Sequence, residues 1–201
     1  MLLQCIQAAA GAGVDAIQLR EKHLSARELS ELALRAAETI RGTNSANKSK
    51  TRLLINSRVD VAIACGADGV HLRSDDISAA DARAVFMQVG VTRPTIAVSC
   101  HRLQEVELAE GHGADLAVFG PIFDKSSTHV APTGIAELKL VCERLRAAKS
   151  SMPVLALGGV DLSNAPECLE AGAAGIAGIR LFQSGALKET VSRLRELGHR
   201  S

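Results

Sequence analysis

Three long polar side chains, Gln18, Arg20 and Lys22, lie two residues apart at the end of a short apolar run. Alternate residues of a β-strand share one face, so the three side chains would project to the same side. Two cations and an amide suit a phosphate or diphosphate, because charged donors form strong hydrogen bonds with such anions. For so short a motif alone, an exposed strand end with surface ion pairs is the more common explanation.

Composition limits the class of protein. The chain has 201 residues, of which 47% are apolar and only 2% aromatic. This length suits one domain, residues 1–201, with small aliphatic side chains packing helices onto parallel strands. With 23 basic and 22 acidic residues the net charge is +1. No general attraction to nucleic acid or to an anionic membrane is expected, and anion binding must be local.

The compartment follows from what the sequence lacks. The five cysteines are odd in number and widely spaced, so they indicate neither a disulfide framework nor a zinc site. No apolar run is long enough to span a membrane, and the N-terminus does not resemble a signal peptide. We therefore expect a cytoplasmic protein without membrane contact.

Short β-branched runs alternate with amphipathic stretches, which predicts βα units on a parallel sheet. The seven expected strands are Ala16 to Arg20, Arg52 to Asn56, Gly69 to Leu72, Thr95 to Cys100, Leu116 to Phe123, Pro153 to Gly158 and Gly175 to Phe182. Expected helices include Leu2 to Ala10, Ala26 to Ile40, Val59 to Cys65, Leu103 to Glu110, Ile135 to Ala147 and Ala165 to Ala171. Ser25 and Asn164 are expected as helix caps. Residues 42–50 are polar and are predicted to form a mobile loop.

A weak internal repeat indicates the architecture. Gly13, Gly66, Gly113 and Gly172 each stand between a predicted helix and the next strand, 47 to 59 residues apart. Glycine suits the left-handed position that ends a helix, and each interval spans about two βα units. Four such quarters predict an α/β fold of the (β/α)8 TIM barrel type. Only seven strands are present, so the first β-strand is missing from this chain.

In such a barrel, chemistry gathers at the carboxyl ends of the strands. Polar residues there include Asn56, Ser57, His71, Asp75, Asp76, Ser99 and His101. Gly158-Gly159 and Ile179-Arg180 end the last two strands, where barrels commonly bind phosphate through backbone N–H groups. A tight turn explains the glycine pair about as well.

Six segments together resemble a known family. They are Ile17 to Lys22, Leu54 to Ala62, Gly66 to Leu72 with Asp75-Asp76, Val98 to His101, Phe119 to Phe123 and Leu157 to Gly159. Their order and spacing, from about residue 10 to 182, resemble the thiamine phosphate synthases. The resemblance implies a transferase of thiamine biosynthesis on a (β/α) barrel. It would join hydroxymethylpyrimidine diphosphate to thiazole phosphate and release pyrophosphate, with Mg²⁺ as cofactor.

The resemblance also assigns roles to residues. It places Gln18, Arg20, Lys22 and Asn56 on the pyrimidine substrate and its diphosphate, Asp76 on Mg²⁺, and Ser99 near the reacting centre. Gly159 and Ile179 match backbone contacts to the thiazole phosphate. Arg20, Lys22, Asn56 and Ser99 are therefore the candidate catalytic residues.

The sequence departs from the family pattern at the metal and at the second substrate. Ser57 stands where the family has its second metal aspartate, and Asp75 is a candidate replacement. Arg73-Ser74 replaces Gly-Gln before the acidic pair. The family's Thr-x-Thr-Lys loop is altered, so Lys125 and Ser127 are expected to supply its contacts. Arg180 replaces a serine and is expected to bind the thiazole phosphate.

Two alternatives stay open. A thiazole tautomerase, an isomerase without diphosphate or metal, would use His101 as an acid or base. A non-catalytic binder of phosphorylated small molecules is the other. His71 is expected as a packed, hydrogen-bonded histidine and Cys100 as inert packing. The resemblance also implies a homodimer.

Overall fold

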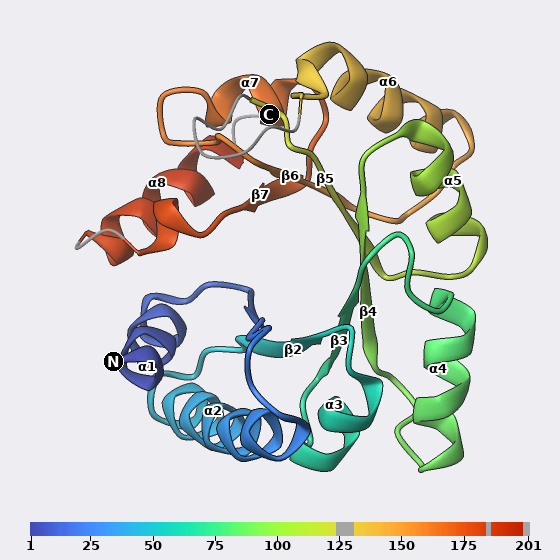
Figure 1. Ribbon diagram of the computed structural model, residues 1–201. Helices are drawn as coiled ribbons and strands as arrows, with labels where there is room; N and C mark the ends of the chain where they lie inside the picture. Colours follow the sequence, from blue (N-terminus) through green and yellow to red (C-terminus); the bar gives the residue numbers. More distant parts are fainter. Residues whose placement is uncertain (124–130, 184–185, 199–201) are drawn as a thin grey trace. The chain divides into compact units, whose positions relative to one another are not determined.

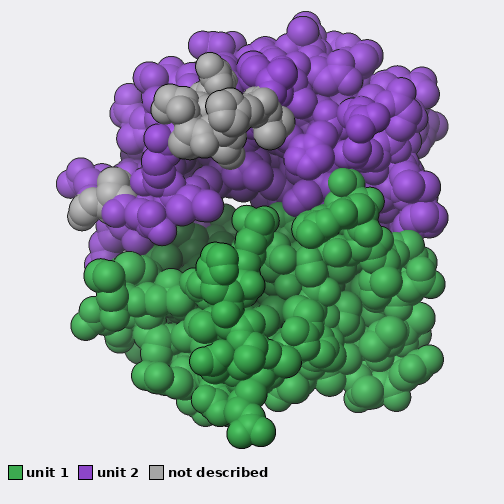
Figure 2. Space-filling view, in the orientation of Figure 1, with its two compact units in different colours: residues 1–96 green, residues 97–201 purple. Residues whose placement is uncertain are grey.

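The computed structural model describes residues 1–123, 131–183 and 186–198. The chain forms two compact units, residues 1–96 (unit 1) and 97–201 (unit 2) (Figure 2). Helices and parallel strands alternate in each unit, so the predicted α/β class is confirmed. The number of strands in the described residues is seven, as predicted, and residues 1–15 contain a helix but no strand.

Unit 1 holds the first three strands and four helices. In chain order they are α1 (Leu2–Ala12), β1 (Ala16–Leu19), α2 (Ala26–Asn47), β2 (Arg52–Asn56), α3 (Val59–Cys65), β3 (Gly69–Leu72) and α4 (Ala79–Gln88). Strand β2 pairs in parallel with β1 and with β3. Helix α2 packs between α1 and α3, and the three helices lie on one side of β2 and β3 (Figure 1).

Strand β4 (Thr95–Cys100) begins in unit 1 and continues into unit 2. The remaining elements are α5 (Leu103–Gly111), β5 (Leu116–Phe119), α6 (Gly134–Ala147), β6 (Val154–Leu157), α7 (Ala165–Glu170), β7 (Gly175–Ala177), the 3₁₀ helix η1 (Arg180–Phe182) and α8 (Leu187–Gly198). Strands β4 to β7 pair in parallel in chain order. Helix α5 packs on α6 (Figure 1).

Four strands are shorter than predicted. Strand β1 ends at Leu19 rather than Arg20, and β6 covers Val154–Leu157 rather than residues 153–158. Strand β5 ends at Phe119 rather than Phe123, and Gly120 and Pro121 after it are joined by a cis peptide bond. Strand β7 ends at Ala177 rather than Phe182, since residues 180–182 turn into η1. Helices α4 and α8 were not among the expected helices.

The predicted polar loop at residues 42–50 is wrong for residues 42–47, which continue α2 to Asn47. Side-chain hydrogen bonds offset the low helix propensity of this segment. The Thr43 hydroxyl donates to the Thr39 carbonyl at 2.8 Å, and the Asn44 amide donates to the Thr51 carbonyl at 2.9 Å. These bonds extend the helix past the point where its apolar pattern ends.

Local signals work as expected at several helix ends. Ser25 caps α2 in a reciprocal capping box with Glu28. The four repeat glycines, 13, 66, 113 and 172, all have φ between 63° and 103°, the conformation that ends a helix. Asn164 occupies the cap position of α7, but its side chain bonds to Asp161 and Gly159 rather than capping.

The core is aliphatic, as composition requires. Strand residues such as Leu53, Ile55 and Val70 are almost fully buried, and Phe86 and Phe119 are the largest fully buried side chains. At Gly69 the strands approach so closely that an added Cβ would lie 1.8 Å from the Thr95 carbonyl oxygen. Only glycine fits at this position.

Candidate active site

Five side chains of unit 1 form one hydrogen-bonded series, which we call the polar chain: His71, Gln18, Asn56, Ser57 and Asp76. His71 Nδ1 lies 2.8 Å from Gln18 Oε1, and Gln18 Nε2 donates to Asn56 Oδ1 at 2.8 Å. Asn56 Nδ2 donates to Ser57 Oγ at 2.9 Å, and Ser57 Oγ donates to Asp76 Oδ2 at 2.6 Å. Side chains from three strand ends therefore meet.

Strand register explains why these residues meet. Gln18 is the Cα partner of Leu54, and Asn56 is the partner of His71. Asn56 lies two residues beyond Leu54, on the same face of β2, so the long glutamine side chain reaches it diagonally. The polar chain thus follows from parallel pairing at the carboxyl ends of β1, β2 and β3.

The polar chain has a direction. A carbonyl oxygen only accepts, so His71 Nδ1 must donate to Gln18 Oε1. Burial, with the nearby Arg20 charge, lowers the pKa of His71 to about 4 against the opposing effect of Asp76. At neutral pH the ring is therefore neutral and carries its proton on Nδ1. Every donor in the polar chain points toward Asp76, which orients the Gln18 and Asn56 amides.

His71 is buried and hydrogen-bonded, so the expectation of a packed histidine is confirmed.

Strand β1 ends at Leu19, so Arg20 and Lys22 lie in the loop that follows. The predicted strand face shared by Gln18, Arg20 and Lys22 is therefore wrong for the two cations. Both are exposed, and neither forms a salt bridge within the part of the chain that the structure describes. Arg20 is nevertheless close enough to His71 to lower its pKa.

The acidic pair after β3 is split between two partners. The Asp75 carboxylate forms an ion pair with the Arg73 guanidinium on the surface, which lowers the pKa of Asp75. Asp76 Oδ2 accepts hydrogen bonds from Ser57 Oγ at 2.6 Å and from the Arg73 backbone N–H at 2.7 Å. Asp75 is thus paired with Arg73 and is not placed to replace the second metal aspartate of the family.

These donors do not fit a resident metal ion. Mg²⁺ prefers several oxygen ligands, usually carboxylates, but the Ser57 hydroxyl donates a hydrogen bond to Asp76 and accepts one from the Asn56 amide. Among residues 1–123, 131–183 and 186–198, no three His, Cys, Asp or Glu side chains gather as a metal cluster. Asp76 as a metal ligand stays a prediction.

In unit 2, predicted residues follow β4. Ser99 is half-buried near the strand end. The ring of His101 donates from Nδ1 to the Gly120 carbonyl at 2.5 Å, and the backbone N–H of His101 donates to Glu105 at 2.6 Å. Cys100 is buried, which raises its pKa to about 12, so it is inert packing as expected.

The predicted phosphate contacts of unit 2 follow β6 and β7. Gly158 and Gly159 have φ of 102° and 67°, which a tight turn requires. The Gly158 carbonyl accepts from the Phe123 N–H, and the Gly159 carbonyl accepts from Asn164 Nδ2. Ile179 and Arg180 are exposed where η1 begins. Lys125 and Ser127 lie outside the described residues.

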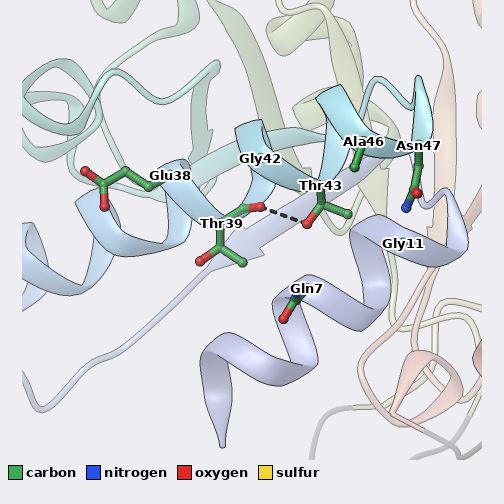
Figure 3. Close-up of a pocket in the computed structure, with 8 residues that line it drawn as sticks. All are labelled: Gln7, Gly11, Glu38, Thr39, Gly42, Thr43, Ala46 and Asn47. Atoms are coloured by element: carbon green, nitrogen blue, oxygen red, sulfur yellow. Dashed lines mark hydrogen bonds between the residues drawn. The ribbon is translucent and has the colours of Figure 1, made fainter.

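A separate groove of about 560 Å³ lies on the helices of unit 1 (Figure 3). It is lined by α1 and α2 through Gln7, Gly11, Glu38, Thr39, Gly42, Thr43, Ala46 and Asn47. The lining contains none of the predicted site residues. The groove therefore does not belong to the polar chain.

Sequence reasoning missed how Ser57 is used. It treated Ser57 as a lost ligand, whereas the hydroxyl links Asn56 to Asp76. Its place directly after Asn56 at a strand end was the available signal.

In α/β enzymes with parallel strands, the active site lies at the carboxyl ends of the strands, where the polar chain lies in this protein. The exposed cations Arg20 and Lys22 suit phosphorylated small molecules as ligands. A family model described as thiamine monophosphate synthase matches residues 1–182. The chain belongs to the thiamine monophosphate synthase family, which confirms the predicted family.

Relatives and solved structures agree. The chain is 42% identical over 178 residues to a putative thiamine-phosphate synthase of Geobacter sulfurreducens, covering 88% of this chain and 76% of that protein. It is 36% identical over 174 residues to the thiamine-phosphate synthase of Chloroflexus aurantiacus, covering 86% and 73%. The thiamine phosphate pyrophosphorylase structure from Pyrococcus furiosus matches with TM-score 0.78 and 27% identity, covering 98% and 89%.

A Rubisco-like protein from Rhodopseudomonas palustris has TM-score 0.74 at 18% identity, covering 100% of this chain and 61% of that chain, and shows the fold alone. Helices of the described residues are all too short or too polar to cross a membrane.

Proposed function

We propose that this chain is a thiamine-phosphate synthase, a transferase that joins hydroxymethylpyrimidine diphosphate to thiazole phosphate and releases pyrophosphate. Membership of the family and the names of its relatives support this activity. The observation in the structure that carries it is the polar chain, which orients the Gln18 and Asn56 amides, with Arg20 near enough to His71 to lower its pKa.

The reaction is a displacement in which the carbon that carries the diphosphate forms a bond to the thiazole while its bond to the diphosphate oxygen breaks. Such a reaction depends on orientation and on neutralising the leaving group, with little acid–base chemistry. Arg20 and Lys22 bind the diphosphate and balance the charge that leaves with it. Gln18 and Asn56, whose amides the polar chain fixes, bind the pyrimidine end.

The second substrate is assigned to unit 2. Ser99 lies near the reacting centre, and backbone groups at Gly159 and Ile179 bind the thiazole phosphate. Arg180 adds a cation to that phosphate site, and Lys125 and Ser127 complete its contacts. The exposure of Arg180 and Ile179 supports this assignment.

The proposal also covers the fold, the compartment, the oligomeric state and the cofactor. The fold is of the (β/α)8 barrel type, of which the described residues hold seven strands, and residues 1–201 form one domain. The protein acts in the cytoplasm as a homodimer on phosphorylated small molecules, without nucleic acid or membrane partners. Mg²⁺ is its cofactor, and the donors around Asp76 do not by themselves form a resident metal site among the described residues.

The test measures thiamine phosphate and pyrophosphate after mixing pure protein with both substrates and Mg²⁺. Arg20→Ala should lower turnover by about 100-fold or more, the usual effect of losing a charged group that stabilises a transition state, with an unchanged Tm. Arg27→Ala, which removes an exposed arginine of α2, is the matched control and should keep full turnover.

If the unaltered protein forms no product but still binds thiazole phosphate, the proposed synthase activity is wrong. Isomerisation of a thiazole carboxylate phosphate by the same sample would then identify a tautomerase. Binding without either conversion would identify a non-catalytic phosphate binder.

A further inference from the structure

The carboxylate of Asp76 is already engaged at one oxygen. Asp76 Oδ2 accepts the Ser57 hydroxyl at 2.6 Å and the Arg73 backbone N–H at 2.7 Å. Two donors at these distances occupy the lone pairs of that oxygen. A cation binding at that oxygen would have to displace a hydrogen bond from a charged acceptor, which is among the stronger hydrogen bonds in proteins.

Ser57 is a weak candidate ligand, because its hydroxyl is neutral and already engaged. The hydroxyl donates a hydrogen bond to Asp76 Oδ2, and its oxygen accepts one from Asn56 Nδ2 at 2.9 Å. Asn56 is in turn held by Gln18, so a cation taking the Ser57 oxygen would disturb the polar chain. The arrangement keeps Ser57 as a donor toward Asp76.

The neighbouring acid does not supply a second ligand, because Asp75 is ion-paired with Arg73. In the described ranges no other group of three metal-binding side chains exists. Mg²⁺ keeps several waters and typically binds through one or two carboxylates together with substrate phosphates. One partly engaged carboxylate is too little to hold it alone.

We propose that unit 1 has no resident divalent-cation site and that the cation enters only together with a diphosphate, whose oxygens supply the missing ligands. Ser57 is the positioning residue that sets this order, since it holds the Asp76 carboxylate and contributes no negative charge. The inference rests on the proposed function for the presence of a diphosphate.

Position 57 allows a sharp test because of its backbone. Ser57 has φ 59°, a left-handed conformation in which asparagine and aspartate are several-fold enriched among non-glycine residues. Ser57→Asp and Ser57→Asn therefore both suit the backbone, and they differ only in charge and one atom. The asparagine variant is the matched control for the aspartate variant.

The experiment is equilibrium dialysis with Mn²⁺ as the probe, with and without inorganic pyrophosphate, counting both species in excess on the protein side. The unaltered protein should hold no excess Mn²⁺ alone at concentrations up to about 1 mM, and should hold Mn²⁺ and pyrophosphate together. Ser57→Asp should tighten binding of Mn²⁺ alone by about tenfold or more, since affinity follows the number of charged ligands. Ser57→Asn should not.

Saturable Mn²⁺ binding by the unaltered protein without pyrophosphate, at well under 1 mM, would overturn the inference. Equal Mn²⁺ affinity for the aspartate and asparagine variants would also overturn it. Turnover with both substrates is measured separately. Mn²⁺ bound alone by an active protein refutes only this inference, whereas joint binding by a protein without turnover refutes only the proposed synthase.

Discussion

His71 makes the stability of the protein depend on pH in a defined window. Burial and the Arg20 charge lower its pKa to about 4, from an ordinary value of 6.5. Between these two values the unfolded chain binds a proton at His71 that the folded protein does not bind. Stability therefore rises with pH across this window and is lost as the pH falls from 6.5 toward 4.

The size of the effect follows from the two pKa values. A tenfold change in proton affinity corresponds to about 1.4 kcal/mol. As the pH falls from 7 to 4, the protonation of His71 alone should lower the free energy of unfolding by about 3 kcal/mol. This is a large part of the 5–15 kcal/mol typical of a folded domain.

The assay is urea unfolding at pH 7.0, 6.0, 5.0 and 4.0, comparing the protein with His71→Asn. Asparagine offers an N–H near the position of Nδ1 for the bond to Gln18 Oε1, but it does not titrate in this range. The variant should lose about 3 kcal/mol less between pH 7 and pH 4. Groups common to both proteins cancel in the difference.

Proton NMR of the imidazole gives the direct measurement. Arg20→Ala should raise the pKa of His71 and Asp76→Asn should lower it further, because these two charges act on the ring with opposite sign. A His71 pKa near 6.5, or the same pH dependence of stability in His71→Asn, would refute the reasoning.

Two further predictions concern packing and exposure. Gly69→Ala should destabilise the protein by about 3 kcal/mol or more, because its Cβ would lie 1.8 Å from the Thr95 carbonyl oxygen. Its control, Gly42→Ala in α2, should stabilise by about 0.5–1 kcal/mol, since nothing lies within 4 Å of the added Cβ; urea unfolding checks both, and equal effects would contradict the packing argument. In a thiol-labelling assay the native protein should react at the exposed Cys5, while the four buried cysteines should react only in denaturant. Rapid labelling of a second thiol in the native protein would contradict the burial.

Much of the fold could be predicted because its signals are local. Gly13, Gly66, Gly113 and Gly172 adopt the left-handed conformation that ends a helix, which depends only on the local backbone. Ser25 and Glu28 form a capping box within one helical turn, without contacts to distant residues. The α2 extension to Asn47 could not be predicted, because it depends on a contact between Asn44 and Thr51 across a turn. That residues 1–201 form a single barrel domain stays a prediction.

In the candidate site, too, some features could be predicted from the sequence and others could not. The sequence alone determined which side chains stand at the strand ends, and its pattern of Gln18, Arg20, Lys22, Asn56 and Asp76 was enough to indicate the family. Only the tertiary structure decided how they connect: the register of β1, β2 and β3 brings Gln18, Asn56 and His71 together, and the loops after β2 and β3 bring Ser57 to Asp76. Hydrogen bonds between residues 19 to 53 positions apart depend on strand pairing, which no local pattern encodes.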